Sequence, residues 1–312
     1  GDSIRSIAVI AKAQKKGSSL APNHLFDYQN IRELAQFLDR PPVAVEQTGQ
    51  VASAWSTVVP LNKGAKGRPL FCIHSGGAHV FFYRALAERM GQEQAIYALQ
   101  PAGLGGEVER PQSIEEMATA YIEALRSVQA TGPYSILGTC FSNAVGLEMA
   151  HQLREAGQRV DRLIFVDSGP VHLQSATARG EKQTLKRMGA MLAKGDWSAI
   201  RKKLHNRFYY FRQQVQAPFE NEQEKNLRLT ITNLNQLYKY YDWQPYEGEI
   251  IFIRSSEFAG RSDKDYHISQ WTELAKGGLE VHVVEGHHLT LFEEPEVAGL
   301  AEQLKVNLTV LS

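Results

Sequence analysis

Gly138-Thr139-Cys140-Phe141-Ser142 decides the fold of this chain, because the stretch has the form of a nucleophile elbow with cysteine at its centre. It follows the apolar run at 134–137 and opens an apolar-periodic stretch at 143–154. This order predicts a strand, a sharp turn and a helix, the context that the G-x-S-x-G pattern requires. Gly138 lets the strand and the helix pass closely, whereas Ser142 stands where glycine is usual and meets that need only in part. The helix would direct its dipole at Cys140 and favour the thiolate; the alternative is a buried structural cysteine.

A nucleophile needs a base, and the base needs an acid that orients it. Downstream of the elbow, three apolar runs at 162–166, 249–254 and 279–284 predict buried strands. Asp167 follows the first run, Glu257 the second, and the pair His287-His288 the third. Nucleophile, acid and histidine therefore come in the chain order of α/β-hydrolases, at the sheet edge where open α/β sheets place their chemistry. Either acid fits this order.

Adjacent histidines point their side chains apart, so at most one of His287 and His288 can be the base. For the same reason the pair does not predict a metal site. His282 lies inside a predicted strand, which favours a place on a sheet face.

Three further segments carry a resemblance to a known family. They are Pro69-Leu-Phe-Cys-Ile-His-Ser-Gly-Gly77, Ile96-Tyr-Ala-Leu-Gln-Pro-Ala-Gly-Leu104 and Gly286-His-His-Leu-Thr-Leu291. With the elbow, they resemble the terminal thioesterase domain of a nonribosomal peptide synthetase, from about Val58 to the C-terminus. The resemblance implies an α/β-hydrolase fold with a helical lid.

The resemblance also selects between the alternatives. The family's G-x-H pattern selects His288 over His287. The family places its acid on the strand that follows the elbow helix, and this position selects Asp167 over Glu257. The chain departs from the family at Cys140, where serine is usual, and at Ser142.

The N-terminal segment resembles part of a peptidyl carrier protein. Gly1-Asp2-Ser3-Ile4 is similar to the site whose serine bears 4′-phosphopantetheine, which would make Ser3 the attachment point of that cofactor. An amphipathic helix at 4–16, the segment 25–31 and a helix with Ile31, Leu34, Ala35 and Leu38 on one face fit a partial all-α helical bundle. The bundle's first helix is missing, so we expect the chain to begin inside a domain. The alternative for Ser3 is an ordinary helix cap.

These features predict the domain organisation of the 312 residues. Residues 1–40 would form the C-terminal part of the carrier protein, 41–57 the linker, and 58–312 the thioesterase domain. Residues at about 170–246 are too many for an unstructured loop, so we expect a helical lid there, with aromatic clusters at 208–211 and 238–243.

Composition excludes several classes of function. The chain has 34 basic and 34 acidic residues, and this balance gives no electrostatic basis for binding nucleic acid. Its two cysteines, Cys72 and Cys140, form no disulfide framework, so we expect a reducing, cytoplasmic location with Cys72 in the core. No apolar run reaches membrane-spanning length, and no signal peptide is present, so we expect no membrane partner.

The expected mechanism follows from these residues. His288 would take the proton of Cys140 while Asp167 holds the imidazole, and the thiolate would attack a peptidyl thioester carried on Ser3. The backbone N–H groups of Phe141 and of Gly76, or a neighbour in that loop, would stabilise the oxyanion.

A cysteine nucleophile keeps the acyl group as a thioester, which is more reactive than the oxoester that serine would form. This reactivity matters most for closing a strained ring. The chain therefore resembles the cysteine-type thioesterases of sulfazecin-type and obafluorin-type synthetases, with β-lactam release favoured over β-lactone release. The alternatives are hydrolytic release or editing, and a non-catalytic docking module. The expected partners are the peptidyl thioester substrate, upstream synthetase domains in cis and a phosphopantetheinyl transferase.

Overall fold

The computed structural model describes residues 31–39, 56–62, 64–101, 110–170, 222–259, 264–288 and 290–309, together with isolated positions between 9 and 30. Within them, seven strands form one sheet of order β1-β3-β2-β4-β5-β6-β7. The strands are β1 (Val58–Pro60), β2 (Leu70–Ile73), β3 (Ile96–Leu99), β4 (Tyr134–Thr139), β5 (Val160–Val166), β6 (Ile250–Ser255) and β7 (Leu279–Val284). β1 pairs antiparallel with β3, and every other pairing is parallel. The α/β architecture expected from the apolar runs is confirmed.

The central strands are apolar at almost every position because both faces of the sheet are buried. In β5, Leu163 and Phe165 belong to one buried cluster, whereas Ile164 and Val166 belong to another. Successive side chains of a strand point to opposite faces, so the two clusters are the two cores on either side of the sheet. Cys72, on β2, is fully buried in one of them.

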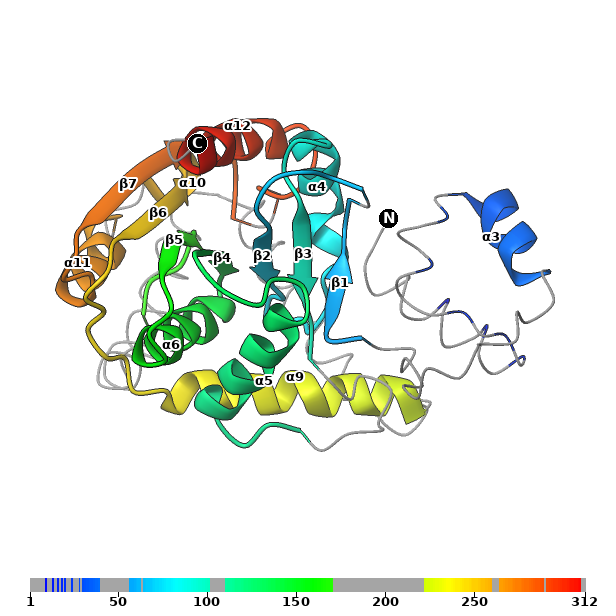
Figure 1. Cartoon of the computed structure of the whole chain (residues 1–312), viewed down its shortest axis with the longest axis horizontal. Helices are drawn as coiled ribbons and strands as arrows, with labels where there is room; N and C mark the ends of the chain where they lie inside the picture. The colour runs from blue at the N-terminus through cyan, green and yellow to red at the C-terminus, as the bar shows by residue number, and fades with distance from the viewer. Residues whose placement is uncertain are drawn as a thin grey trace, which may run out of the picture.

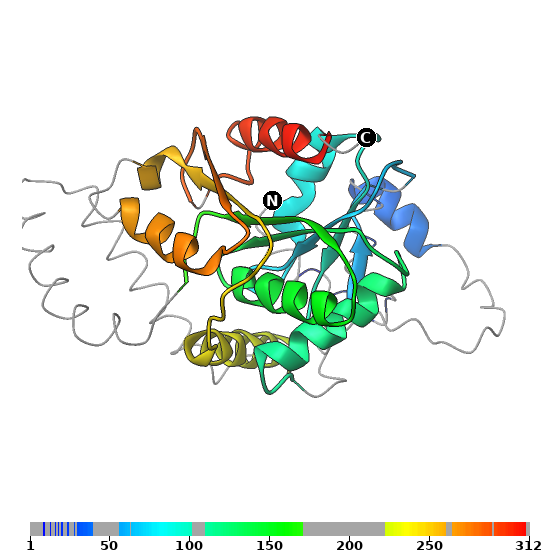
Figure 2. The same cartoon turned by 60° about the vertical axis from the view of Figure 1, so that its left-hand side comes forward.

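Helices cover both faces of this sheet (Figures 1 and 2). α4 (Arg84–Met90) and α12 (Val297–Thr309) lie on one face, and α5 (Ile114–Arg126), α6 (Ser142–Glu155) and α11 (Lys264–Leu274) on the other. α9 (Glu222–Tyr240) lies farther from the sheet than α6, beside one end of α5. The short helices η1 (Phe81–Tyr83) and α10 (Ser256–Ala259) follow β2 and β6.

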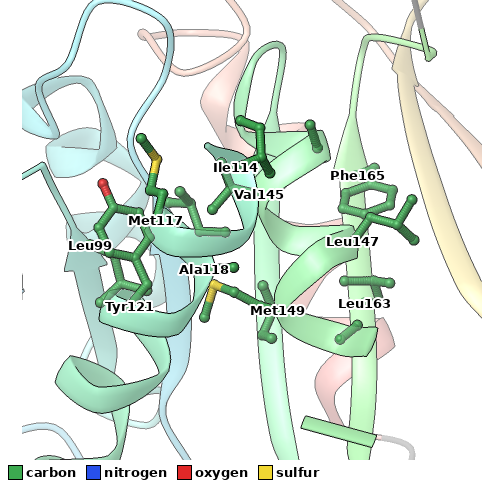
Figure 3. Close-up of a cluster of buried hydrophobic side chains, with 14 of the residues drawn as sticks. Leu99, Ile114, Met117, Ala118, Tyr121, Val145, Leu147, Met149, Leu163 and Phe165 are labelled. Carbon is green, nitrogen blue, oxygen red and sulfur yellow. The ribbon is translucent and has the colours of Figure 1, made fainter. Parts of the chain in front are cut away.

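The helix that follows the elbow packs tightly on the sheet (Figure 3). At Gly146 of α6, an added Cβ would lie 3.1 Å from Phe165 and 3.5 Å from Ile73. These distances leave little room for a side chain. Val145, Leu147 and Met149 fill the surrounding core with side chains of α5 and β5. The start of α6, and Cys140 just before it, is thereby held in a fixed position on the sheet.

The N-terminal segment is described mainly by α3 (Ile31–Leu38), which confirms the helix expected there. Asn30 caps it, since its side-chain oxygen accepts a hydrogen bond from the backbone N–H of Glu33 at 2.9 Å. Leu34 and Leu38 are partly buried, whereas Ile31 is exposed. In Figure 1 this helix lies to one side of the sheet, beyond β1. Ser3 lies outside the described residues, so the carrier bundle remains a prediction.

Two other predicted regions fall largely outside the described residues. They are the linker at 41–57, described only from Ser56, and the lid at 170–246, described at Pro170 and from Glu222. Within the described part of the chain, no helix combines the length and the apolar character needed to cross a membrane.

Candidate active site

Cys140 lies in a strained turn between β4 and α6. Its φ angle is +56°, a left-handed conformation that residues other than glycine rarely adopt. Such strain is typical of functional sites, where it presents a side chain in a fixed direction. The turn is possible because Gly138 has no side chain: an added Cβ would lie 2.8 Å from the carbonyl oxygen of Ser142. The predicted strand, turn and helix are all present.

Ser142 occupies the usual glycine position in a way that the sequence alone did not indicate. Its side chain is fully buried and folds back over the turn. The hydroxyl oxygen accepts a hydrogen bond from the backbone N–H of Thr139 at 2.8 Å and donates one to the Thr139 carbonyl at 2.9 Å. Ser142 therefore closes the elbow with its own side chain.

The structure places Asp167 and His288 in direct contact. Asp167 ends β5, is 1% exposed and has a φ angle of +64°. One of its carboxylate oxygens accepts a hydrogen bond from the backbone N–H of Ser255 at 2.6 Å. The other lies 3.1 Å from Nδ1 of His288, so the carboxylate orients the ring and leaves Nε2 as the nitrogen that can contact Cys140.

The rival acid and the rival histidine form a separate pair. Glu257 lies 2.8 Å from Nε2 of His287, and both side chains are about one third exposed. His282 lies 2.8 Å from Glu280, two residues away on the same strand. The choice of Asp167 and His288 thus agrees with the contacts, although their catalytic role stays a prediction.

The pKa values of Cys140 and His288 move in opposite directions. Hydrogen bonds that His288 donates to Asp167 and Cys140 raise its pKa from 6.5 to about 9, against the effect of burial. Burial acts to raise the pKa of the Cys140 thiol. Its hydrogen bond with His288 and the charge of that ring, with smaller contributions from Phe141 and Ser168, outweigh this and lower the pKa below its usual value. Both shifts therefore favour the ionised forms, the thiolate and the imidazolium, relative to the isolated side chains.

The two residues expected to supply oxyanion donors are neighbours in space. A Cβ added at Gly76 would lie 3.6 Å from the Cβ of Phe141, so the glycine loop after β2 touches the elbow. The backbone N–H of Phe141 is also among the groups that lower the pKa of Cys140.

His74, just before that loop, is fully buried, and its ring stacks on Phe141 at 5.6 Å. Its Nδ1 lies 2.6 Å from the Ser75 carbonyl, which can only accept, so this nitrogen carries the proton. Burial lowers the pKa of His74 to about 4.

Sequence reasoning missed two residues that reach Cys140. Ser168 contributes to the lowering of the Cys140 pKa. Burial, and to a smaller extent the charge of Cys140, raises the pKa of Tyr238 on α9. The Tyr238 ring also contacts Phe141, with 5.8 Å between ring centroids. The aromatic cluster at 238–243 and the place of Ser168 beside Asp167 were the available signals. Neither shows which side chains converge on the sulfur.

Together these residues provide the parts needed for acyl transfer. They supply an activated sulfur, a histidine that can accept and return a proton, a buried carboxylate that orients the histidine, and a backbone N–H at the sulfur.

Comparison with known proteins agrees with this chemistry. The sequence model of the thioesterase domain family matches residues 68–305. Over its full length the chain is 26% identical to a dimodular nonribosomal peptide synthase of Bacillus subtilis (strain 168) and 26% identical to the chondramide synthase of Chondromyces crocatus. It spans only 13% and 8% of the length of these relatives.

Solved structures show the same fold. The NocB thioesterase domain from the nocardicin cluster superposes with a TM-score of 0.60 at 21% identity, covering 81% of this chain and 99% of that one. The thioesterase domain SrfTE gives a TM-score of 0.56 at 16% identity over 82% of this chain and 97% of that one. A four-domain nonribosomal peptide synthetase bound to AMP and glycine gives 0.63 at 21% identity, over 99% of this chain and 24% of that one.

Proposed function

This chain belongs to the thioesterase domain family, and from that premise we propose that it releases a peptidyl chain from a nonribosomal peptide synthetase. The observation that carries the proposal is the contact series from Asp167 through His288 to Cys140 in the elbow. Cys140 is the nucleophile, His288 the general base and acid, and Asp167 the orienting carboxylate.

Acylation begins with attack of the Cys140 sulfur on the carbonyl carbon of a pantetheine thioester. The new C–S bond forms as the carbonyl π electrons move to oxygen, and the N–H groups of Phe141 and Gly76 stabilise that oxyanion. When the intermediate collapses, the bond to the pantetheine sulfur breaks and His288 gives its proton to the leaving thiol. The product is a peptidyl thioester on Cys140.

Release then needs a second nucleophile, and we propose that it lies within the peptide. His288 takes the proton of an internal amine or hydroxyl, the ring bond forms at the acyl carbon, and Cys140 leaves as the thiol. A serine nucleophile would hold the peptide as a less reactive oxoester, whereas cysteine retains the activation that a strained ring requires. This reasoning favours a strained four-membered ring, for which we propose a β-lactam, with a β-lactone as second choice. Ring closure by a domain of this fold is supported by SrfTE, described as cyclising the lipopeptide antibiotic surfactin.

We further propose that residues 1–40 are the C-terminal part of a carrier protein, with 4′-phosphopantetheine on Ser3. Residues 41–57 would be the linker, 58–312 the thioesterase domain and about 170–246 the helical lid, of which α9 is the described helix. The match to a four-domain synthetase over 99% of this chain supports such a pairing. Upstream synthetase domains in cis and a phosphopantetheinyl transferase would then be its partners.

The test is the mass of the product formed from a dipeptidyl or tripeptidyl pantetheine thioester that carries an internal amine or hydroxyl. We expect a product one water lighter than the free acid, with no product from a Cys140→Ala enzyme. The free acid alone would instead identify a hydrolytic releasing or editing enzyme and exclude cyclisation for that substrate. If Cys140 reacted with iodoacetamide no faster than a model thiol, the chain would be a docking module.

A further inference from the structure

Two neighbouring strands of the sheet end in the same unusual way. β4 and β5 pair in parallel, and Thr139 at the end of one lies opposite Val166 at the end of the other. The next residues, Cys140 and Asp167, therefore leave the sheet side by side, and both are left-handed, with φ angles of +56° and +64°. Residues other than glycine keep such angles only where their surroundings hold them. The nucleophile and the acid thus lie in two adjacent strained turns.

Asn143 connects these two turns directly. It lies three residues after Cys140, in the first turn of α6, and it is fully buried. Its Nδ2 donates a hydrogen bond of 2.8 Å to the backbone carbonyl of Ser168, the residue after Asp167. A carbonyl oxygen can only accept, so the amide must present Nδ2 to it. The bond therefore runs from the helix that follows the nucleophile to the turn that follows the acid.

The turn that contains Ser168 has further contacts with α11. The Ser168 carbonyl accepts a second hydrogen bond from Nε1 of Trp271 at 3.0 Å. Gly169 packs so closely on the ring of His267 that an added Cβ would overlap it. Trp271 and His267 both belong to α11, so of these three contacts the one from Asn143 relates the turn to the elbow.

We propose that Asn143 is a positioning residue that ties the acid turn to the nucleophile elbow, so that the Asp167 carboxylate stays within reach of His288. The role rests on the proposed function, because it assumes that Asp167 orients His288 for catalysis by Cys140. The contact that Asn143 would protect is the 3.1 Å approach of the carboxylate to Nδ1 of His288. A catalytic group displaced by about 1 Å can lower the rate about 100-fold, so one hydrogen bond at this place has a large effect.

A merely structural role for Asn143 predicts a different outcome from a positioning role. The Oδ1 atom of Asn143 is buried and has no hydrogen-bond partner among the residues that the structure describes. Burial of such an acceptor is unfavourable, and alanine, the best helix former, removes it. The Ser168 carbonyl also keeps its bond from Trp271. We therefore expect Asn143→Ala to change the stability of the fold little.

The test compares Asn143→Ala with Asn62→Ala by two measurements, the pH profile of kcat/KM for pantetheine release and the midpoint of unfolding in urea. Asn62 also bonds to the backbone through its side chain. It donates to the carbonyls of Gly91 at 2.7 Å and Gln94 at 2.6 Å, and it accepts from the N–H of Ile96 at 2.8 Å. These bonds lie at the start of β3, at the opposite edge of the sheet from the site.

The two variants should differ in both measurements. The alkaline limb reports the His288 proton and lies near pH 9. We expect Asn143→Ala to move this limb down by about half a unit to one unit and to lower kcat/KM about tenfold. Asn62→Ala should leave the limb in place but lower the urea midpoint more than Asn143→Ala does, because it loses three hydrogen bonds.

The Asp167→Asn enzyme tests the route by which Asn143 acts. If Asn143 acts through the Asp167 carboxylate, Asn143→Ala should cause no further shift of the alkaline limb in an Asp167→Asn enzyme. Cys140, which also acts on the pKa of His288, is unchanged in all these enzymes, and so is Glu257, which faces the neighbouring histidine.

Each outcome decides a separate claim. An Asn143→Ala enzyme with the wild-type alkaline limb, or one that loses more stability than Asn62→Ala or does not fold, overturns the positioning role. A shift that adds fully to that of Asp167→Asn overturns it as well. A Cys140→Ala enzyme that releases pantetheine as fast as the wild type overturns the proposed function instead. The expected result is a lowered limb in a stable Asn143→Ala enzyme, with no such shift in the Asp167→Asn background.

Discussion

Replacing Asp167 by asparagine is the perturbation whose consequences follow most directly from the contacts. The asparagine oxygen can keep the hydrogen bond from the N–H of Ser255, now 2.6 Å, and its NH₂ group then faces His288 Nδ1. A donor facing Nδ1 favours the tautomer with the proton on Nε2. That nitrogen would then donate to Cys140 and could no longer take its proton.

The size of the effect follows from the pKa of His288, which is raised from 6.5 to about 9 with the Asp167 hydrogen bond as the largest cause. One pKa unit corresponds to 1.36 kcal/mol, so the whole shift represents about 3 kcal/mol. The Cys140 contact contributes part of it. We therefore expect Asp167→Asn to lower kcat/KM about 100-fold and to narrow the bell-shaped pH profile from both sides.

The two limbs of the pH profile should move in opposite directions. The alkaline limb reports loss of the His288 proton, so it lies near pH 9 in the wild type and moves down by about one to two units when the carboxylate is lost. The acidic limb reports the Cys140 thiolate, which loses a stable imidazolium partner, so that limb moves up. The assay is chromatographic detection of released pantetheine, because thiol reagents would also modify Cys140.

Glu257→Gln is the matched control, because Glu257 pairs with His287 and not with His288. It should leave both limbs where they are. An Asp167→Asn enzyme with the wild-type profile, or a Glu257→Gln enzyme whose alkaline limb moves down, would refute the assignment of the acid.

Three further substitutions have defined outcomes. Gly138→Ala places a Cβ 2.8 Å from the Ser142 carbonyl oxygen, and we expect the free energy of unfolding to fall by about 2–4 kcal/mol in a denaturant titration. Gly299→Ala is the control: its Cβ meets open space, so the free energy of unfolding should not fall. Ser142→Ala leaves the buried N–H of Thr139 without its 2.8 Å hydrogen bond and should lower the free energy of unfolding by about 1–3 kcal/mol in the same titration. A variant as stable as the wild type would show that the hydroxyl does not hold the elbow. Cys140→Ser should still be acylated but then stall or hydrolyse, so cyclic product from this variant would contradict the role given to thioester activation.

The strands were predictable because parallel strands buried on both sides are continuous apolar runs. The apolar run at 279–284 has the same first and last residues as β7. β5 begins two residues before its run at 162–166, because Val160 pairs with Tyr134 and a register shift then skips Asp161 before Arg162 pairs with Ser135. β1 has only three residues and ends in proline, so neither its length nor its pattern indicates a strand.

The site residues that follow one another in a known order along the chain could be predicted from the sequence. The residues that reach the site only because the chain folds could not. Spacing placed Cys140, two candidate acids and two histidines at strand ends, but the choices of Asp167 over Glu257 and of His288 over His287 came from a family resemblance. Ser142 and Ser168 are ordinary polar residues in the sequence. Their importance depends on a hydroxyl folding back on a turn and on a carbonyl held by two side chains, and neither leaves a periodic signal.

The central claim is that Cys140 takes the acyl group as a thioester, and the intact mass of the enzyme after mixing with an acyl-pantetheine tests it most directly. The predicted result is a mass gain of one acyl group, mapped to the Cys140 peptide and removed by neutral hydroxylamine, as a thioester should be. Release of pantetheine with no adduct on Cys140, or with an adduct that resists hydroxylamine or maps to another residue, would contradict the account.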